Sequence, residues 1–311
     1  MEPEISVQIP VRNGGEEFGQ ALLSLAGQRT DGIPWELVII DDGSTVPVEK
    51  EYDLSFPEHV EVKVLRREGR GNRPIARNMG WQAASAGISF LSDGDILFPE
   101  DILLKHILAH RTRPADVVMG ARVNAWMEDA TPWQKWFDTR AMGGKPAGPF
   151  PPRYFVTGNI SLRTALLEKT GGFDGRIDHY GGEDTEFGFR LARIRAELYW
   201  DPELEVYHLD RVTVREHSRK MVEYGGTGLR YTLEKIPEAG GMLGTDWVGP
   251  VFSKPANVSL IIMRILVRIT LIPAVYRTVL RWMERFGTPS FLFTYLSVGG
   301  CLMGYRGRNF E

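Results

Sequence analysis

The sequence predicts an α/β fold in which a mostly parallel sheet carries helices on both faces. Strand-like and helix-like segments alternate through the first third of the chain. Two acidic clusters follow predicted strand ends, where ligands bind in sheets of this kind. The composition is that of an ordinary globular protein, with 43% hydrophobic and 25% charged residues. A chain of 311 residues holds one large domain, or a domain with an appendage.

Apolar patterns place the elements of the first third. Strands are expected at residues 5–11, 35–40, 60–65 and 88–91. A helical period covers Phe18 to Leu25. A second helix should begin at Pro74, a favourable first residue, and continue to Ala83. The order of these segments is the alternation on which the fold prediction rests.

The remaining two thirds of the chain mix short strands, loops and helices. We expect a loop at 143–152, a strand at 154–160, and helices at 164–170, 183–195 and 211–235. An apolar helix should follow at 257–285, bent at Pro273. From Lys254 to Arg308 there are eight Lys or Arg residues and one acid, a net charge of +7. The tail is therefore predicted to be a basic helical extension.

Charge, cysteine content and hydropathy exclude several classes of protein. The net charge of -3 does not suit a protein that coats nucleic acid. The single cysteine, Cys301, permits no internal disulfide and no CxxC metal site, which fits a reducing cytoplasm. We expect no signal peptide. We also expect no spanning helix, because three arginines interrupt the longest apolar stretch, Val258 to Val279.

Asp93-Gly94-Asp95 is the first candidate for chemistry. Two carboxylates one residue apart at a strand end can face one pocket, and such oxygen ligands suit Mg²⁺ or Mn²⁺. A divalent ion would stabilise the charge that builds on a departing diphosphate. The alternative is an ordinary turn, since Asp and Gly favour turns. The position after a strand of an α/β pattern favours the metal site.

Three further clusters each leave two interpretations open. Asp41 to Thr45 could bind a nucleotide's base or ribose, or form a polar turn. The arginines between Arg70 and Gly80 could bind phosphate at a helix start, or form a solvated basic turn. His179 to Asp184 could carry a general base, or simply cap a helix. His208 alone would more often be structural than a metal ligand.

The ordered set of motifs resembles the family 2 glycosyltransferases, whose catalytic domain has the GT-A fold. The resemblance covers roughly residues 4–210. It rests on the segments Val7-Gln-Ile-Pro-Val-Arg-Asn13, Val38-Ile-Ile-Asp-Asp-Gly-Ser-Thr45, Ala76-Arg-Asn-Met-Gly80, Phe90-Leu-Ser-Asp-Gly-Asp95, Gly158-Asn-Ile-Ser161, Gly171-Gly-Phe-Asp174 and Gly182-Glu-Asp184. The Gln-x-x-Arg-Trp motif of the processive members is absent, because no glutamine precedes Arg281-Trp282 at that spacing. A non-processive enzyme is therefore implied.

The resemblance implies a nucleotide-binding set in the first third of the chain. Pro10 and Val11 would flank the base, and Asp42 would bind the base or the ribose. Arg77 would lie near the nucleotide, and Asp93 would face the nucleotide-sugar. UDP is the nucleotide that family habit favours, with TDP and GDP left open.

The resemblance also implies a metal site and a catalytic base. Asp95 would be the principal protein ligand of Mn²⁺ or Mg²⁺, and His208 matches a position where some members supply a further ligand. Asp184 would take the proton from the acceptor hydroxyl, with Glu183 orienting the acceptor or its loop. The transfer would invert the anomeric centre by direct displacement.

These expectations define a domain plan. Residues 1–210 would form the GT-A catalytic domain, with a nucleotide-sugar half at about 1–98 and an acceptor half at about 99–210. Residues 211–311 would form the helical extension. The loop from Ala125 to Arg153 could shape the acceptor site, with its tryptophans, Trp126, Trp133 and Trp136, stacking on sugars or filling the core.

The predicted reaction is sugar transfer from a nucleotide-diphosphate sugar to a saccharide or lipid-linked hydroxyl, in cell-surface polysaccharide or glycoconjugate synthesis. A catalytically silent relative that binds a nucleotide-sugar or a glycan is the alternative. The protein would be cytoplasmic, and its arginine-bearing tail helices could lie on the inner face of an anionic membrane. Packing on the protein's own domain or in a homodimer is equally open. The donor sugar, acceptor and linkage are not readable from the sequence.

Overall fold

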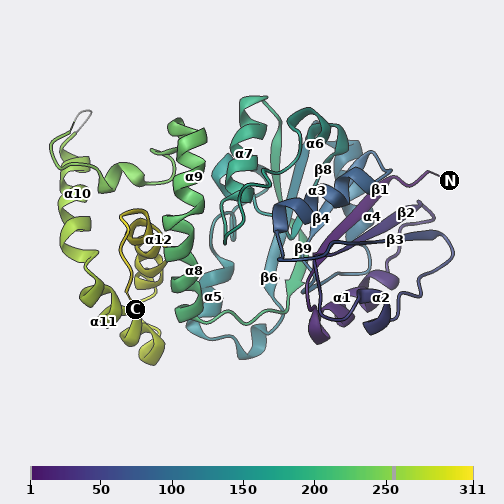
Figure 1. The fold of residues 1–311 in the computed structure, drawn as a ribbon, viewed down its shortest axis with the longest axis horizontal. Coiled ribbons are helices and arrows are strands. Elements are labelled where there is room, and N and C mark those ends of the chain that lie inside the picture. Colours follow the sequence, from purple (N-terminus) through teal and green to yellow (C-terminus); the bar gives the residue numbers. More distant parts are fainter. Residues whose placement is uncertain (1, 254–256, 311) are drawn as a thin grey trace. The chain divides into compact units, whose positions relative to one another are not determined.

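A nine-stranded sheet organises the part of the chain that carries the predicted site motifs (Figure 1). The structure is a computed structural model that describes residues 2–253 and 257–310. It divides into two compact units. The first comprises Met1–Met127, Asp138–Asp178 and Phe187–Asp210, and the second comprises Glu128–Phe137, His179–Glu186 and Arg211–Glu311. The predicted domain boundary at residue 210 remains a prediction.

The sheet is parallel on one side and mixed on the other. Its strands are β1 (Ile5–Val11), β2 (Trp35–Asp41), β3 (Val60–Arg66), β4 (Ile88–Ser92), β5 (Ile96–Leu97), β6 (Val117–Asn124), β7 (Gly148–Pro149), β8 (Asn159–Arg163) and β9 (Leu198–His208). The order is β3-β2-β1-β4-β8-β6-β9-β5, and β7 pairs with β9. The first four strands in this order are mutually parallel, whereas β8 runs antiparallel to both of its neighbours. The α/β fold class is thus confirmed, and parallel pairing joins the strands of the first third of the chain and recurs between β6 and β9.

Helices cover both faces of the sheet. The first unit has α1 (Gly15–Ala26), α2 (Val48–Glu51), α3 (Arg73–Ala83), α4 (Ile102–Thr112) and α6 (Thr164–Thr170), and α7 (Glu183–Arg193) extends into it. Leu37 and Ile39 of β2 share a core cluster with α1 and α4. Val38 and Ile40 point to the other face and pack on α3. This alternation is the period-two pattern of a strand buried on both faces.

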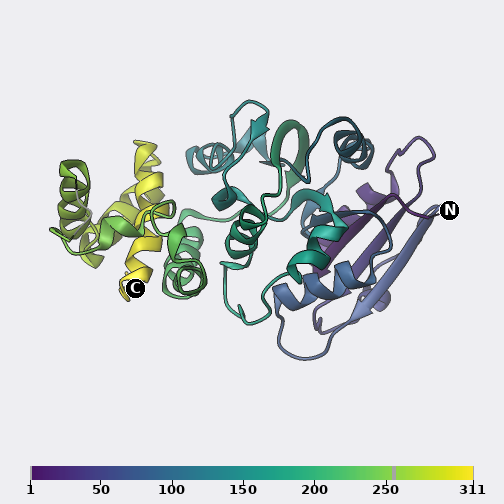
Figure 2. The same cartoon turned by 90° about the horizontal axis from the view of Figure 1, so that it is seen from above.

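Helices also build the second unit. It contains α5 (Pro132–Asp138) except for the last residue of that helix. Its others are α8 (Val214–Gly226), α9 (Gly228–Lys235), α10 (Val258–Thr270), α11 (Pro273–Phe286) and α12 (Phe291–Tyr305), and the green-to-yellow ones can be followed in Figure 2. Short 3₁₀ turns occur at Met127–Asp129, Pro152–Tyr154, Pro237–Ala239 and Thr245–Val248. Within the part of the chain described, no one helix has the length and apolarity needed to cross a membrane. α10 and α11 meet that criterion only as a pair, bent by 79°.

Three of the predicted helices and strands differ from the structure. The helix expected at 211–235 is two helices, α8 and α9, with a break at Thr227. The strand expected at 154–160 is formed only at 159–160, the start of β8, and residues 154–158 form the end of a 3₁₀ turn and a loop. Pro151 and Pro152 cannot donate to a strand ladder, and Gly158 adopts φ +115°, so pairing is delayed until Asn159. The helix expected at 257–285 is two helices, α10 and α11. Its first predicted residue, Asn257, lies before α10 as the N-cap, and its side chain accepts a hydrogen bond from the Leu260 amide at 2.8 Å.

A buried polar chain links α4 to three strands. Asn159 donates through its amide nitrogen to the carbonyl oxygens of Ala121 and Leu204, at 2.8 and 2.7 Å. Its Oδ1 is therefore left to accept from His106 Nε2 at 3.0 Å. His106 Nδ1 must then accept from the Ser161 hydroxyl at 2.7 Å, and Ser161 in turn accepts from His110 Nε2 at 2.9 Å. The chain requires the His106 imidazole to be neutral, and burial keeps His110 neutral by lowering its pKa.

Glycines bring α8 and α12 of the second unit into contact. A Cβ added at Gly225 would lie 1.8 Å from the Cys301 carbonyl oxygen, and one at Gly304 would lie 1.9 Å from that of Val222. The two helix backbones therefore approach closely only because these positions lack side chains. Gly226, the next residue, would meet nothing nearer than 3.5 Å.

We expect Gly225→Ala to lower the stability of the second unit by roughly 1–3 kcal/mol, because the added methyl group forces α8 and α12 apart. Gly226→Ala is the matched control and should be neutral or stabilising, since Ala is the better helix former. Thermal unfolding followed by circular dichroism compares the two. Equal melting temperatures for both variants would contradict the close approach.

Acid should weaken the fold through the buried histidines. Burial lowers the pKa of His106 to about 3 and that of His110 to about 4, from an ordinary value of 6.5. Both are neutral in the folded state, so their contribution is complete above pH 6.5 and is lost as the pH falls toward about 4. The free energy of unfolding should fall by about 1.4 kcal/mol per pH unit for each histidine.

Denaturant unfolding across this pH window measures the effect. His110→Gln should reduce the slope, because one titrating group is removed. The exposed His59 provides the control, and His59→Gln should leave the slope unchanged. A slope that is the same in wild type and His110→Gln would show that the buried pair does not set the acid sensitivity.

Candidate active site

Asp93 lies between two arginines at the end of β4. Its Oδ1 accepts from Arg77 Nη2 at 2.8 Å, and its Oδ2 lies 3.1 Å from Arg122 Nη1. Burial alone would raise the pKa of Asp93, but Arg77 first, then Arg122, lower it to about 2. Gly158 leaves the necessary room, because a Cβ there would lie 2.7 Å from Arg122 Nη1 and 3.0 Å from Asp93 Oδ2. Asp93 is therefore a fixed anion.

Arg77 supports this arrangement from α3. Its side chain is 1% exposed, and it also donates to the Ser92 carbonyl oxygen at 3.3 Å. In this structure it acts as a positioning partner of Asp93, and its predicted contact with a nucleotide stays a prediction. The Ser92 hydroxyl donates to the Gly158 carbonyl oxygen at 2.9 Å, which joins β4 to the residue that makes room for Arg122.

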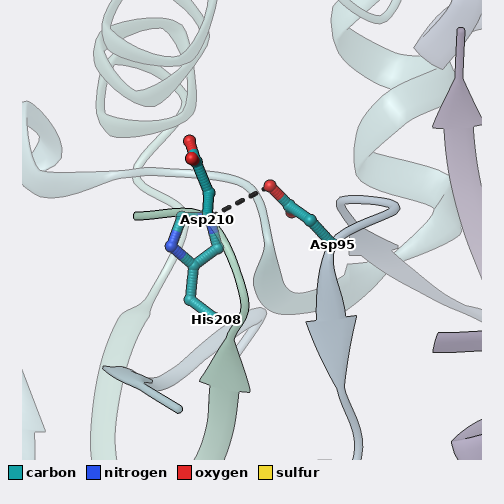
Figure 3. Close-up of side chains that lie close together, drawn as sticks. All are labelled: Asp95, His208 and Asp210. Carbon is teal, nitrogen blue, oxygen red and sulfur yellow. Dashed lines mark ion pairs between the residues drawn. The ribbon is translucent and has the colours of Figure 1, made fainter. Parts of the chain in front are cut away.

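Asp95, His208 and Asp210 gather beside this anion (Figure 3). One ligand atom of each lies within 4.8 Å of the others, and Asp95 Oδ2 lies 3.2 Å from His208 Nε2. Main-chain pairing brings them together, because β5 pairs with β9 in the register Ile96↔His208 and the Leu209 amide donates to the Asp95 carbonyl oxygen at 2.9 Å. Residues more than a hundred positions apart are thus held by a sheet ladder.

The cluster fits a divalent cation. Two carboxylates and an imidazole form a donor set that suits an ion such as Mn²⁺. Asp95 Oδ1 is buried and has no hydrogen-bond partner among the residues that the structure describes. A buried carboxylate oxygen without a partner is costly, and a cation would satisfy it. Asp95 and His208 are the two metal ligands predicted from the sequence, and the structure adds Asp210.

Asp42 organises the approach to α3. Its side chain is 7% exposed, its Oδ1 accepts from Arg67 at 2.6 Å, and its Oδ2 accepts from the Asn72 amide at 2.7 Å. Asn72 is the N-cap of α3, so Asp42 fixes the start of the helix that carries Arg77. The adjacent Asp41 is fully buried and accepts from the Ser44 amide at 2.7 Å, which closes the turn after β2.

Pro10 and Val11 end β1 at the same sheet edge as Asp42. Pro10 is paired with Ile40 and Val11 with Asp41, and Pro10 is partly exposed. Because β1, β2 and β4 are parallel, their carboxyl ends lie at one edge, as predicted. The structure therefore brings Pro10, Val11 and Asp42 to one edge, and their contact with a base stays a prediction.

Glu183 and Asp184 begin α7 within the second unit. Glu183 is 4% exposed, and Asp184 is partly exposed. The glycines before them pack on α9, since a Cβ at Gly182 would lie 2.7 Å from the Gly228 Cα. Glu223 of α8 accepts from the Tyr180 amide at 3.3 Å. The loop that leads to the predicted base is thus held by helices of the predicted extension.

Two of the three tryptophans are core residues. Trp133 is 6% exposed and stacks on Trp136 with ring centroids 5.2 Å apart, and both contact Phe293 of α12. Trp126 is 39% exposed, and its indole nitrogen donates to the Leu209 carbonyl oxygen at 3.1 Å. It therefore lies next to the strand end that bears His208 and Asp210, and it is the most exposed of the three.

Sequence reasoning missed Arg122, Asp210 and Asp138. Arg122 lies mid-strand in β6, and Asp210 lies two residues after the end of β9. Burial raises the pKa of Asp138, opposed by its hydrogen bond from the Asn124 amide and by Arg140 and His208 nearby. No motif marks these residues, although a full-length β9 prediction ending at His208 would have pointed to Asp210.

Comparison with known proteins identifies the family of the chain. The family model described as glycosyl transferase family 2 matches residues 6–190. The pre-mycofactocin glycosyltransferase of Mycobacterium tuberculosis is 26% identical over 230 residues, which cover 72% of this chain and 46% of that protein. The chain thus spans about half the length of that curated relative.

Solved structures share the fold. A mannosyltransferase, PcManGT of Pyrobaculum calidifontis, in complex with GDP-Man and Mn²⁺, superposes with a TM-score of 0.61 at 17% identity, covering 99% of this chain and 87% of that one. The S. aureus protein TarS, residues 1–349, in complex with UDP-GlcNAc, gives a TM-score of 0.55 at 17% identity, covering 99% and 93%. At these identities the likeness concerns the fold alone, which is of the GT-A type.

We expect Asp210→Asn to weaken Mn²⁺ binding by roughly tenfold or more, because removing a charged ligand lowers the affinity of a carboxylate site. Asp95→Asn should have a larger effect, since Asp95 is less exposed than Asp210 and its buried Oδ1 has no other partner among the described residues. Isothermal titration with MnCl₂, with and without a nucleoside diphosphate, measures it. The exposed Asp53 is the control, and Asp53→Asn should bind as wild type. Wild-type affinity in Asp210→Asn would remove Asp210 from the ligand set.

Proposed function

Because the chain belongs to glycosyl transferase family 2, we propose that it transfers a sugar from a nucleoside-diphosphate sugar to a hydroxyl group of an acceptor, inverting the anomeric centre. The observation that carries this proposal is the cluster of Asp95, His208 and Asp210 beside the fixed anion Asp93. The buried Asp95 Oδ1, which has no hydrogen-bond partner among the described residues, supports a cation-assisted donor site.

The donor is proposed to be a UDP-sugar. Family habit favours UDP, and a structure of the same fold holds UDP-GlcNAc. Another holds GDP-Man with Mn²⁺, so the nucleotide has to be tested rather than assumed. Pro10, Val11 and Asp42 would receive the nucleoside, since they line the edge where β1 and β2 end. Asp42 would offer its carboxylate only by sharing it with Arg67 and the Asn72 amide.

Asp95, His208 and Asp210 would hold Mn²⁺ or Mg²⁺. When bound, such an ion neutralises charge on the diphosphate as a Lewis acid. Asp93, kept ionised by Arg77 and Arg122, would accept hydrogen bonds from donor hydroxyl groups. Because each carboxylate oxygen of Asp93 is bound by a different arginine, the carboxylate cannot rotate. It would therefore position the donor without reorganisation of the site.

Asp184 would act as the general base. The acceptor oxygen attacks C1 of the donor sugar as the bond from C1 to the diphosphate oxygen breaks, and the acceptor proton passes to the Asp184 carboxylate. Products are the glycoside, with inverted configuration, and the nucleoside diphosphate. Glu183 would orient the loop of which it is a buried part. Asp184 is the more exposed of the two, which suits the residue that meets an acceptor.

The acceptor is proposed to be a saccharide or a lipid-linked hydroxyl, in the synthesis of a cell-surface polysaccharide or glycoconjugate. Trp126 supports a sugar ligand, because its partly exposed ring lies beside the strand end that bears His208 and Asp210. Aromatic faces of this kind pack against the apolar face of a sugar ring. Cytoplasmic location and a homodimer through the tail helices stay predictions.

A panel of UDP-, TDP- and GDP-sugars tests the function. With Mn²⁺, one nucleotide should raise the melting temperature, and its sugar should be transferred slowly to water, releasing nucleoside diphosphate. Asp184→Asn should keep the thermal shift and lower this release by roughly a hundredfold or more, because only the base is lost.

Asp178→Asn, an exposed acid near the same loop, is the control and should behave as wild type. A thermal shift without any release, either to water or to a range of saccharide acceptors, would indicate a silent nucleotide-sugar-binding relative. Near-normal release by Asp184→Asn would show that another group is the base.

A further inference from the structure

The outward face of α10 is apolar. Its exposed side chains include Val258, Ile262, Leu266 and Ile269, which are 73%, 52%, 48% and 59% exposed, and Ile265 is 41% exposed. Their spacing of three and four residues places them on one side of the helix. A helix of a folded protein normally turns such a face toward the core. Here the apolar face is turned away from it.

The inward face of α10 explains why its apolar side chains point outward. Arg264 is 4% exposed and donates to the carbonyl oxygens of Asp246 and Pro250, at 2.8 and 2.9 Å, and to that of Ser253 at 2.9 Å. The sequence analysis allowed the arginines of the tail helices to face an anionic membrane. Arg264 does not, because it binds main-chain oxygens of residues 246–253, and the isoleucines lie on the outer side of α10.

The exposed apolar surface continues along the chain. Val275, Trp282 and Phe286 of α11 are 39%, 51% and 50% exposed, and Phe291 at the start of α12 is 67% exposed. Together with the α10 side chains they form what we term the apolar face. Exposed apolar side chains gathered on successive helices in this way mark an interaction site, whereas isolated exposed residues do not.

Cations border the apolar face. Arg268 on α10 and Arg277, Arg281 and Arg285 on α11 are all exposed. Among the described residues none of the four forms an ion pair with a carboxylate. The nearby acid, Glu284, is already bound by Arg215, at 2.7 and 2.6 Å. On the surface of α11, Arg281 and Arg285 form a row that lies next to the row of Trp282 and Phe286. The border is therefore basic without an internal counter-charge.

We propose that the apolar face docks on the surface of an anionic lipid membrane. Apolar side chains bordered by arginines match the boundary between acyl chains and negatively charged headgroups. Trp282 suits the same layer, because indole rings favour the membrane interface. The 79° bend and the shortness of each helix favour helices that lie in the surface over helices that cross it. The inference concerns the second unit and does not depend on the proposed reaction.

Flotation with vesicles tests the proposal. The full chain should float with phosphatidylglycerol–phosphatidylcholine vesicles at low salt, less at high salt, and poorly with phosphatidylcholine alone. Ile262→Ser with Ile269→Ser should reduce binding on the order of tenfold or more, because both side chains are exposed and enter the lipid. Arg281→Gln with Arg285→Gln should reduce it about thirtyfold at low salt, at about 1 kcal/mol for each charge.

Matched controls come from the first unit. Leu23→Ser removes an apolar side chain of α1 that is 76% exposed, and Lys50→Gln with Lys169→Gln removes two exposed charges. Both should bind as wild type. Circular dichroism and melting temperatures should be unchanged in all variants, since every substituted side chain is exposed.

Three results would overturn the proposal. The wild-type chain could fail to float with anionic vesicles at low salt. The isoleucine pair could bind as well as wild type. Sedimentation could reveal a dimer that the isoleucine substitutions convert to a monomer while vesicle binding is unaltered, which would assign the apolar face to a second copy of the chain.

Discussion

A carboxylate placed between two guanidinium groups ties the first unit together. Asp93 needs Arg77 and Arg122, because an ionised carboxylate that loses much of its water must be paired. Arg77 comes from α3 and Arg122 from β6, so the pairing joins both halves of the sheet at β4. Gly158 is required to make room for it. Asp95, the first of the metal candidates, follows this anchor by two residues, and pairing between β5 and β9 brings His208 and Asp210 to it.

Residues in several of the sequence motifs have a structural role. Asn78 of the Ala76–Gly80 segment donates to the Phe173 carbonyl oxygen and accepts from the Phe173 amide, both at 2.8 Å. It thereby joins two motifs that the sequence presents separately. Asn159 and Ser161 order the buried histidines of α4. These residues therefore support the site through the fold, whereas Asp95, His208 and Asp210 are the residues proposed to hold the cation.

The second unit combines two tasks. Its helices α8 and α9 hold the glycine loop before Asp184, through Glu223 and Gly228. Its helices α10 and α11 expose the apolar face. A lipid-linked acceptor would make sense of both, because the unit that carries the proposed base would also be the unit that meets the membrane. In that case the helical tail has a functional role as well as a structural one.

By itself the sequence determined the fold class, the four strands of the first third, and the acidic residues at their ends, because strand periodicity and strand-end placement are local properties. It also pointed to His208 as a companion of Asp95. Tertiary structure alone decided that Asp210 joins them, that Arg122 balances Asp93, and that Arg264 faces inward. These outcomes depend on pairing between β5 and β9 and on the packing of α10, which are contacts between distant segments. No local pattern encodes such contacts, so the direction of a helix face or the third member of a cluster emerges only when the chain is folded.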